Sequence, residues 1–410
     1  MAVFLRLFAA QVVALVGTGL LTVALGLLAY DLAGDSAGAV LGTVLAIKML
    51  AYVFVAPLMS AATDRLPRKT VLIGADLTRA GVAVLLPFVG EIWQVLVLVF
   101  VLQAASATFT PAFQSVIPAV LRDEQAYTRG LALSRLAYDL EAMVSPLLAA
   151  ALLTVLSYNS LFVGTVAGFV ASALLVRGAQ IPGIGADRSP WRRRLWSGMR
   201  VMLTDNDLRA LLAMNLAVAA ATALVMVNTV VYVRGMLGGG DAAVAVALSC
   251  YGAGSMAAAL MVPGLLGRLA DRVVMLAGTC AAAAGLLVVT AVFPLSWTTL
   301  VGTWVLLGAA TSMVNTPAGR LLRRASTDTN RTAVFTAQFS LSHAGFLLTY
   351  PIAGWVGATV NQGLAAAILA ILSSSAAIAA AWIMVRGTGG KARQPTPTGA
   401  EPRPRQLTRP

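Results

Sequence analysis

Two ionisable side chains, Glu141 and Lys48, lie deep inside long apolar stretches of the sequence. Glu141 follows Arg129 by about 18 Å of helix, and Lys48 lies about 15 Å from the end of its own apolar run, at 1.5 Å per residue. A charge in mid-membrane costs about 2.5–3.5 kcal/mol unless it is paired or hydrated. A carboxylate at this depth can bind and release a proton. We therefore predict that Glu141 either carries a coupling proton or forms a fixed salt bridge with Lys48.

Two further acid–base pairs have the spacing at which opposite charges meet on one helix face. Asp76 and Arg79 are three residues apart, and Arg135 and Asp139 are four apart. We predict that both pairs are structural.

The remaining polar groups in these stretches are single or uncharged. His343 lies beside Ser340 and Ser342, and we predict for it a hydrogen-bonded packing role over metal or proton binding, because it is the one histidine of the chain. Cys250 and Cys280 lack the spacing of metal ligands, so we expect free thiols, no metal site and no cofactor. Polar side chains that could line a cavity, or hydrogen-bond between helices, are Gln103, Asn215, Asn228, Asn315 and His343 itself.

The composition requires that membrane-spanning helices position these residues. Of the 410 residues, 59% are hydrophobic and 11% are charged, and the mean hydropathy is +0.85. Such values lie far outside the soluble range. Because one crossing takes about 20 residues, the apolar runs predict an all-α membrane protein with twelve transmembrane helices in two pseudo-symmetric six-helix bundles. The expected spans are 7–32, 38–61, 70–90, 93–116, 130–156, 158–178, 209–233, 240–266, 272–294, 296–318, 331–358 and 362–386.

These spans divide the chain into four parts. We predict an N-terminal six-helix bundle at 1–178, a cytoplasmic linker at 179–207, a C-terminal six-helix bundle at 208–386 and a disordered tail at 387–410. In the linker, apolar residues recur at helical spacing opposite arginines, which predicts an amphipathic helix at the cytoplasmic interface. Those apolar residues are Trp191, Leu195, Met199 and Met202.

The basic residues predict the orientation of the chain. Most of the 29 Lys and Arg residues fall in segments on one side of the predicted membrane, whereas the opposite loops carry Arg234 and several acids. The positive-inside rule then places both termini in the cytoplasm, in a multi-pass protein of the plasma (inner) membrane. Because the cations lie between apolar segments and not on one soluble surface, the net charge of +13 does not indicate nucleic-acid binding.

Corresponding acidic and proline residues recur in the two halves of the chain at nearly the same spacing. Asp64 and Asp271, Pro111 and Pro317, and the prolines at 146 and 351 are separated by nearly equal intervals of about half the chain. Equal offsets in chain order indicate parallel repeats of six spans, an arrangement found in transporters whose substrate site lies between the halves.

A charged patch between the second and third spans has a counterpart half a chain later. The patch from Ser60 to Lys69 reads SAATDRLPRK, and residues 267–272 read GRLADR. The patch resembles the signature G-x-x-x-D-R-x-G-R-[RK] of the major facilitator superfamily, with Ser60 and Pro67 where the family has glycine. The resemblance covers residues 1–386 and implies that these charges gate the conformational cycle. The gating residues would be Asp64, Arg65, Arg68, Lys69, Asp271 and Arg272.

The fifth span resembles a second signature of that family. Residues 145–150 read SPLLAA, where exporters of the family carry a glycine, a proline and paired glycines. We expect Pro146 and its counterpart Pro351 at helix-packing positions, since small residues permit close helix contact in lipid. With TFTPAF at 108–113, the chain is similar to the twelve-span drug-efflux branch, and residues 28–32 and 338–343 are also similar to exporters linked to nickel resistance.

These observations favour a monomeric secondary active transporter that exports small apolar or amphipathic compounds by alternating access, with protons as the coupling ion. The alternatives are export of nickel or cobalt ions and a non-transporting receptor on the same scaffold. The sequence has no phosphate loop of the form G-x-x-x-x-G-K-[ST], and His343 is its one imidazole base. We therefore expect neither an ATP-driven pump nor an enzyme.

Overall fold

The computed structural model describes residues 2–33, 37–155, 157–182 and 190–391, and within them every regular element is helical. The first half comprises α1 (Ala2–Ala33), α2 (Ala37–Leu50), the π-helical turn η2 (Ala51–Val55), α3 (Ala56–Thr63), α4 (Arg68–Leu85), the short turn η3 (Leu86–Phe88), α5 (Ile92–Val120), α6 (Glu124–Leu153) and α7 (Asn159–Gly178). The linker contains α8 (Trp191–Thr204). The second half comprises α9 (Asn206–Val230), η4 (Val231–Met236), α10 (Asp241–Leu266), α11 (Asp271–Ala291), α12 (Trp297–Ala325), α13 (Arg331–Pro351), η5 (Ile352–Val356), α14 (Gly357–Thr359) and α15 (Gln362–Lys391).

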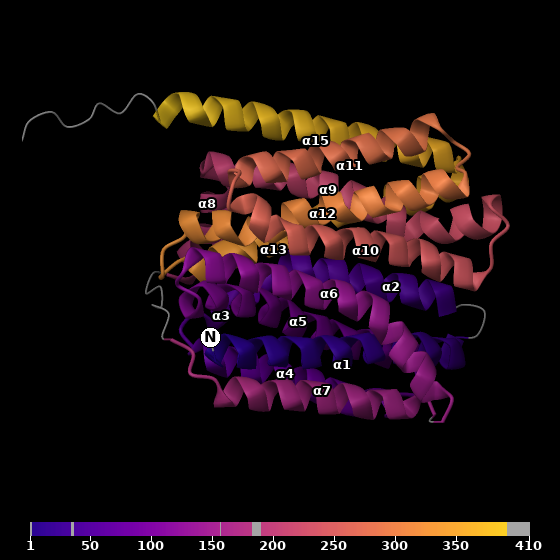
Figure 1. Cartoon of the computed structure of the whole chain (residues 1–410). Coiled ribbons are helices and arrows are strands. Elements are labelled where there is room, and N and C mark those ends of the chain that lie inside the picture. Colours follow the sequence, from indigo (N-terminus) through magenta and orange to yellow (C-terminus); the bar gives the residue numbers. More distant parts are fainter. Residues whose placement is uncertain (1, 34–36, 156, 183–189, 392–410) are drawn as a thin grey trace, which may run out of the picture.

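The long helices run side by side in two groups (Figure 1). The pieces α2–η2–α3, α9–η4 and α13–η5–α14 each form one continuous rod, so the described residues make six long rods in each half. Ten of them are long and apolar enough to cross a membrane; α6 and the rod that begins with α13 run beside these ten. The predicted all-α fold with two six-helix bundles is confirmed.

Several helices extend beyond the predicted spans. The helices α5 and α12 continue to Val120 and Ala325, past the expected ends at 116 and 318, and α15 continues to Lys391. Hydropathy measures only the apolar part of a helix, whereas the backbone hydrogen bonds continue through polar residues until a cap or turn ends them. The predicted tail, 387–410, lies largely outside the described residues.

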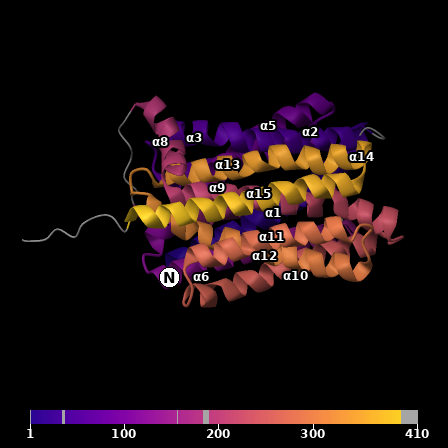
Figure 2. The same cartoon turned by 90° about the horizontal axis from the view of Figure 1, so that it is seen from above.

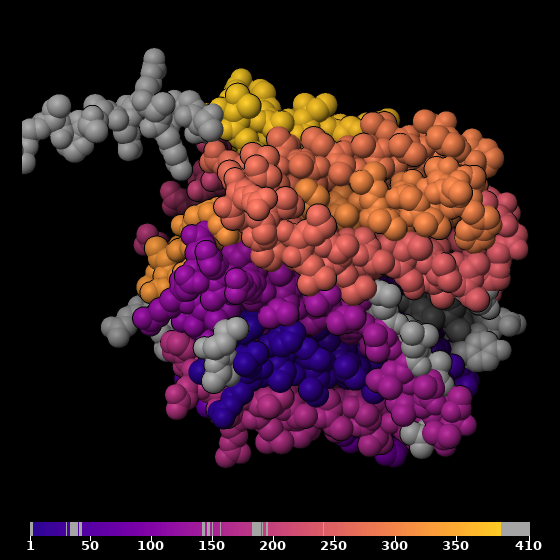
Figure 3. All heavy atoms as spheres, viewed as in Figure 1, coloured from indigo at the N-terminus to yellow at the C-terminus, as the bar shows by residue number. Residues whose placement is uncertain are grey.

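One end of the molecule carries most of the arginines considered below. The chain start, α8, the end of α3 and the end of α12 all lie at this end, on the left of Figure 1. We call it the arginine-rich end and define it by residues 64–69 and 320–324. In Figure 3 the two halves form adjoining blocks that meet along the length of the rods.

Close approach of α10 and α12 depends on two glycines. A Cβ atom at Gly254 would lie 2.0 Å from the Val305 carbonyl oxygen, and one at Gly308 would lie 1.9 Å from the Tyr251 carbonyl oxygen. Each glycine thus lets the backbone of the partner helix occupy the space of a side chain, as small residues do at helix contacts in membranes.

The linker helix α8 lies across the arginine-rich end, roughly perpendicular to the long rods (Figure 2). Met202 is fully buried in a cluster with Leu208 and Val334, and a Cβ atom at Gly198 would lie 2.0 Å from the Ala333 carbonyl oxygen. Met202 therefore packs inside the protein, because this side of α8 lies on α9 and α13. The side chains of Trp191 and Leu195 lie outside the described part of the structure.

Candidate functional site: the interface between the halves

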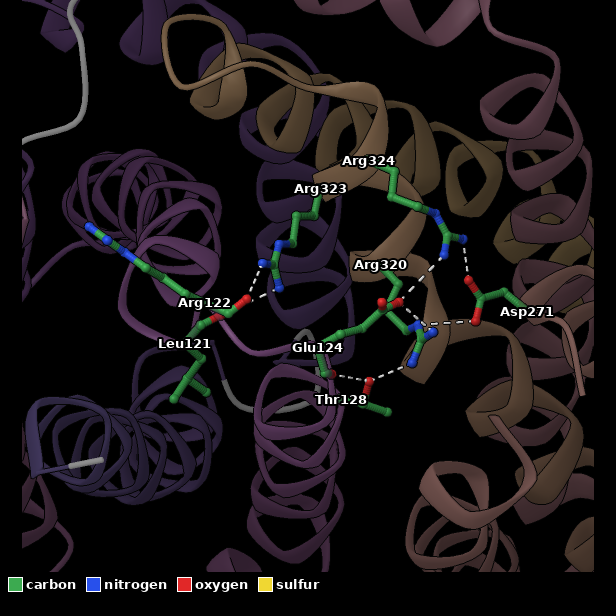
Figure 4. Close-up of polar contacts among 8 residues, drawn as sticks. All are labelled: Leu121, Arg122, Glu124, Thr128, Asp271, Arg320, Arg323 and Arg324. Atoms are coloured by element: carbon green, nitrogen blue, oxygen red, sulfur yellow. Dashed lines mark hydrogen bonds and ion pairs between the residues drawn. The ribbon is translucent and has the colours of Figure 1, made fainter. Parts of the chain in front are cut away.

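A charged network joins the halves at the arginine-rich end (Figure 4). Asp271 of α11 forms ion pairs with Arg320 and Arg324 of α12, the former at 3.0 Å between Nε and Oδ1. Arg320 also donates to Glu124 Oε1 and Thr128 Oγ1 of α6, both at 2.6 Å. Because α6 belongs to the first half and α12 to the second, Arg320 holds a carboxylate from each half at once.

Local structure explains how these charges meet. Arg320 and Arg324 are four residues apart on α12, so both point to the same side of the helix. Asp271 lies in the first turn of α11 and Glu124 in the first turn of α6, where the helix dipole stabilises a negative charge. Asp123 caps α6 by accepting a hydrogen bond from the Ala126 amide at 2.7 Å.

Contacts other than ion pairs complete the closure at this end. The Tyr127 hydroxyl donates to the Gly319 carbonyl at 3.0 Å, and Ser115 on α5 lies 3.1 Å from Thr332 on α13 between their hydroxyl oxygens. Arg323 donates to the carbonyl of Arg122 at 2.5 Å and stacks over the Tyr127 ring. Since Ser115 is buried and Thr332 nearly so, the two halves exclude water here.

The predicted gating residues divide between these contacts and others. Asp271 lies in the inter-half network, whereas Asp64 pairs with Arg68 inside the first half, with both side chains buried. Arg272 pairs with Asp207 at 2.6 Å inside the second half. The remaining two predicted residues differ in exposure: Arg65 is exposed and Lys69 half-buried.

A second polar link lies deeper, between α6 and α10. Arg135 and Asp139 form the predicted ion pair at 2.9 Å, and Ser255 of α10 donates to Asp139 Oδ2 at 2.7 Å. Arg135 in turn donates to the Ser255 hydroxyl at 3.0 Å. The pair therefore reaches across the interface, whereas Asp76 and Arg79 remain inside the first half, where Ser172 donates to Asp76 at 2.7 Å.

Glu141 lies on α6, further from the arginine-rich end than the Arg135–Asp139 pair. Its Oε1 atom packs against α1, where a Cβ atom at Gly19 would lie 3.1 Å away. Lys48 exerts an electrostatic attraction on the Glu141 carboxylate, but no ion pair within 4.0 Å joins these two described residues. The fixed salt bridge considered from the sequence is thus not formed in this state. Lys48 instead lies with Nζ 5.7 Å from the centre of the Tyr52 ring.

Aromatic rings surround His343 on α13. The His343 ring centre lies 4.9 Å from that of Tyr52, 4.4 Å from that of Phe339 and 5.8 Å from that of Phe346. Its Nδ1 donates to the Phe339 carbonyl at 2.7 Å. The arrangement shows the hydrogen bond and packing proposed for His343, and it brings a ring from the first half, Tyr52, against the second.

Other candidate residues lie away from this centre. Asn228 is fully buried and donates to the Ala353 carbonyl at 2.9 Å and to Gln362 Oε1 at 2.5 Å. It thus ties α9 to η5 and α15, which is the interhelix role considered from the sequence. Gln103 and Asn315 are half-buried. Pro351, the last residue of α13, is exposed, so its ring does not pack between helices as predicted. The side chain of Pro146 lies outside the described part.

Sequence reasoning missed Glu124, Arg320, Arg324 and Ser255. The positive-inside rule uses Arg320 and Arg324 only to orient the chain in the membrane. Their four-residue spacing near a helix end could also have indicated a shared partner. Another signal is the break in the repeat: the residues 206 positions before Arg320 and Arg324 are Gln114 and Pro118. The basic pair that binds Asp271 therefore has no counterpart in the first half.

Comparison with known proteins agrees with this architecture. The sequence profile of the Major Facilitator Superfamily matches residues 7–273 and 211–409. Macrolide efflux protein A of Streptococcus pyogenes is 29% identical over 219 residues, which cover 51% of this chain and 53% of that protein. The chain thus spans about half the length of the curated relatives it matches.

Solved structures extend the likeness to nearly the whole chain. The human organic anion transporter MFSD10 (TETRAN) has a TM-score of 0.77 at 14% identity, covering 92% of this chain and 98% of that one. A bacterial homologue of the iron transporter ferroportin, in its outward-facing state, has a TM-score of 0.74 at 14% identity and covers 95% and 100%. At such identity these likenesses show the fold. The profile matches, which together span nearly all of the sequence, show that the chain belongs to the Major Facilitator Superfamily, a family of membrane transporters.

Proposed function

We propose that this transporter exports small apolar or amphipathic compounds, macrolides among them, by alternating access coupled to protons. The arginine-rich end faces the cytoplasm of the cell whose plasma membrane holds it, as the positive-inside rule requires. The macrolide efflux relatives, at 29% and 31% identity, support this cargo class.

The observation that carries the proposal is the closure of the interface at the arginine-rich end. The link from Asp271 through Arg320 to Glu124 joins the halves there, and the Ser115–Thr332 contact shields the path beneath it. In an exporter such a gate prevents return of the cargo to the cytoplasm. We assign the structure to the outward-facing state of the cycle on this basis.

The centre of the interface supplies the groups for cargo and coupling. Tyr52, Phe339, His343 and Phe346 offer ring faces to an apolar compound, with few fixed charges around them. Glu141 carries the proton. In the protonated form its carboxyl is neutral and the attraction to Lys48 is lost, whereas release of the proton restores the negative charge and the attraction. This difference in charge is what allows a proton to bias one conformation over the other.

Drug resistance tests the export directly. A sensitive host expressing the chain is compared with one expressing Arg320→Gln, in which the charged gate is broken, across macrolides, other amphipathic drugs and nickel or cobalt salts. We expect the intact chain to raise resistance to amphipathic drugs. Resistance to the metal salts alone would indicate that the cargo is a metal ion, and unchanged sensitivity to every compound would contradict export.

Proton coupling is tested separately, in inverted membrane vesicles with or without a pH gradient imposed across the membrane. We expect uptake of a labelled macrolide only with the gradient. Uptake that is equal under both conditions would contradict coupling, and binding without any flux would indicate a receptor.

A further inference from the structure

Pro57 removes one backbone hydrogen bond from the rod that contains α2, η2 and α3. In an α-helix the N–H of residue 57 would bond to the carbonyl of Val53, but proline has no N–H. The rod widens at this point into the π-helical turn η2, in which the Ala56 N–H bonds to the Ala51 carbonyl. The Val53 carbonyl therefore lacks its ordinary α-helical donor.

Ser340 of the opposite half provides a donor for that carbonyl. Its hydroxyl, on α13, donates to the Val53 oxygen at 2.5 Å, and Ser340 is only 2% exposed. The Tyr52 and Phe339 rings lie beside the bond with their centres 4.8 Å apart, and Tyr52 packs against the buried cluster that Phe339 forms with Ala56 and Ala107. Water is thus kept away from the carbonyl.

Such a bond matters because a carbonyl that has lost its α-helical donor gains stability from a hydroxyl donor where no water is at hand. The bond requires α13 to lie against η2, as it does here with the halves closed at the arginine-rich end. When that end opens, Ser340 moves away from Val53, and the Val53 carbonyl can then accept a hydrogen bond only from water or from the cargo.

We infer that Ser340 is a positioning residue that latches the halves in the closed state, and that Pro57 creates the need for it. The inference rests on the alternating access proposed above, but not on the identity of the cargo. The latch is uncharged, so unlike the Arg320 network it keeps its strength at high salt.

The test measures the opening of the arginine-rich end by the distance between spin labels. The labels are attached at Arg129→Cys and Arg268→Cys, in a chain whose Cys250 and Cys280 are replaced by Ser. Both positions are exposed at the arginine-rich end, and they belong to the neighbouring helices α6 and α10 of opposite halves, Arg268 just beyond the end of α10. The measurement is made in lipid at high salt and at a pH where the parent chain shows both short and long distances.

We expect Ser340→Ala to lower the ratio of closed to open molecules by about three- to ten-fold, the size of one ordinary hydrogen bond. Ser340→Thr keeps the hydroxyl and should restore the ratio. Ser342→Ala is the matched control, because Ser342 bonds to the Phe339 carbonyl of its own helix, at 2.9 Å.

Pro57→Ala separates a latch from a merely structural serine. Alanine supplies an N–H and lets the turn close to a regular α-helix, in which that N–H bonds to the Val53 carbonyl, so in this background Ser340→Ala should leave the ratio unchanged. An equal effect of Ser340→Ala with and without Pro57, or no effect in either, would overturn the latch. A single distance for the parent chain under every condition would instead contradict alternating access, and a chain that switches without exporting any drug would contradict only the proposed cargo.

Discussion

The polar side chains of the interface differ in how strongly they are held. Asp271 is held by two arginines and Asp139 by Arg135 and Ser255, so these carboxylates are fixed in place. Glu141 lies near Lys48 without pairing to it. A carboxylate that already has strong partners cannot easily exchange a proton, whereas one without a fixed ion pair can. This contrast supports the proposal that Glu141 carries the proton.

Replacing Glu141 with Gln should abolish transport driven by a proton gradient, because an amide cannot bind and release the proton at this site. Uptake by inverted vesicles is expected to fall to the rate seen without a gradient. Glu91→Gln is the matched control, since Glu91 is an exposed carboxylate outside the predicted membrane core. Gradient-driven uptake that survives in Glu141→Gln would remove Glu141 from the coupling mechanism.

Helix packing decides which elements can move as units. The backbones of α10 and α12 meet at Gly254 and Gly308, so we expect these helices to move together. The contact of α6 with α10, by contrast, includes a polar link from Asp139 to Ser255 that joins opposite halves. Sequence periodicity indicated the helices and their number, because apolar length alone determines a membrane span. The sequence could not indicate the contacts at Gly308, because a single glycine looks the same in a sequence whether a neighbouring backbone or empty space lies beside it in the fold.

Gly308→Ala should destabilise the second half by about 1–3 kcal/mol, because its methyl group would overlap the Tyr251 carbonyl and force α10 away. Thermal unfolding in detergent measures the loss as a lower Tm. Gly302→Ala in the same helix meets nothing within 4 Å and should be neutral, or stabilising by up to about 1 kcal/mol. Equal Tm values for the two variants would show that α10 and α12 do not pack this closely.

At the scale of the molecule, two similar halves close through an asymmetric gate. The regular spacing of Asp64 and Asp271 predicted the repeat and hence the fold. It also suggested equal roles for the two acids, but Asp64 pairs within its own half while Asp271 joins the inter-half network. The difference depends on Arg320 and Arg324, which lie 49 and 53 residues from Asp271 in sequence. A motif read by itself does not contain such distant partners.

A disulfide across the gate should stop transport. The Ser115 and Thr332 oxygens lie 3.1 Å apart, so cysteines at both positions, in a chain with Cys250 and Cys280 replaced, should oxidise readily. Oxidation is expected to reduce drug uptake by vesicles to background, and a reductant should restore it. Each single cysteine variant should stay active. Full transport by the oxidised double variant would show that the halves need not part at this end.

One helix, α6, carries three of the acidic side chains on which the proposed cycle depends. Along α6 lie Glu124 at the gate, Asp139 at the link to α10 and Glu141 at the centre, all on one unbroken element. Inhibitor design can exploit this concentration. On the proposed mechanism, a compound bound against the central part of α6 would obstruct proton binding at Glu141 and hinder the inter-half contacts of Glu124 and Asp139 at once. Single substitutions at the rings proposed to bind the drug would then give a resistant cell little escape from it.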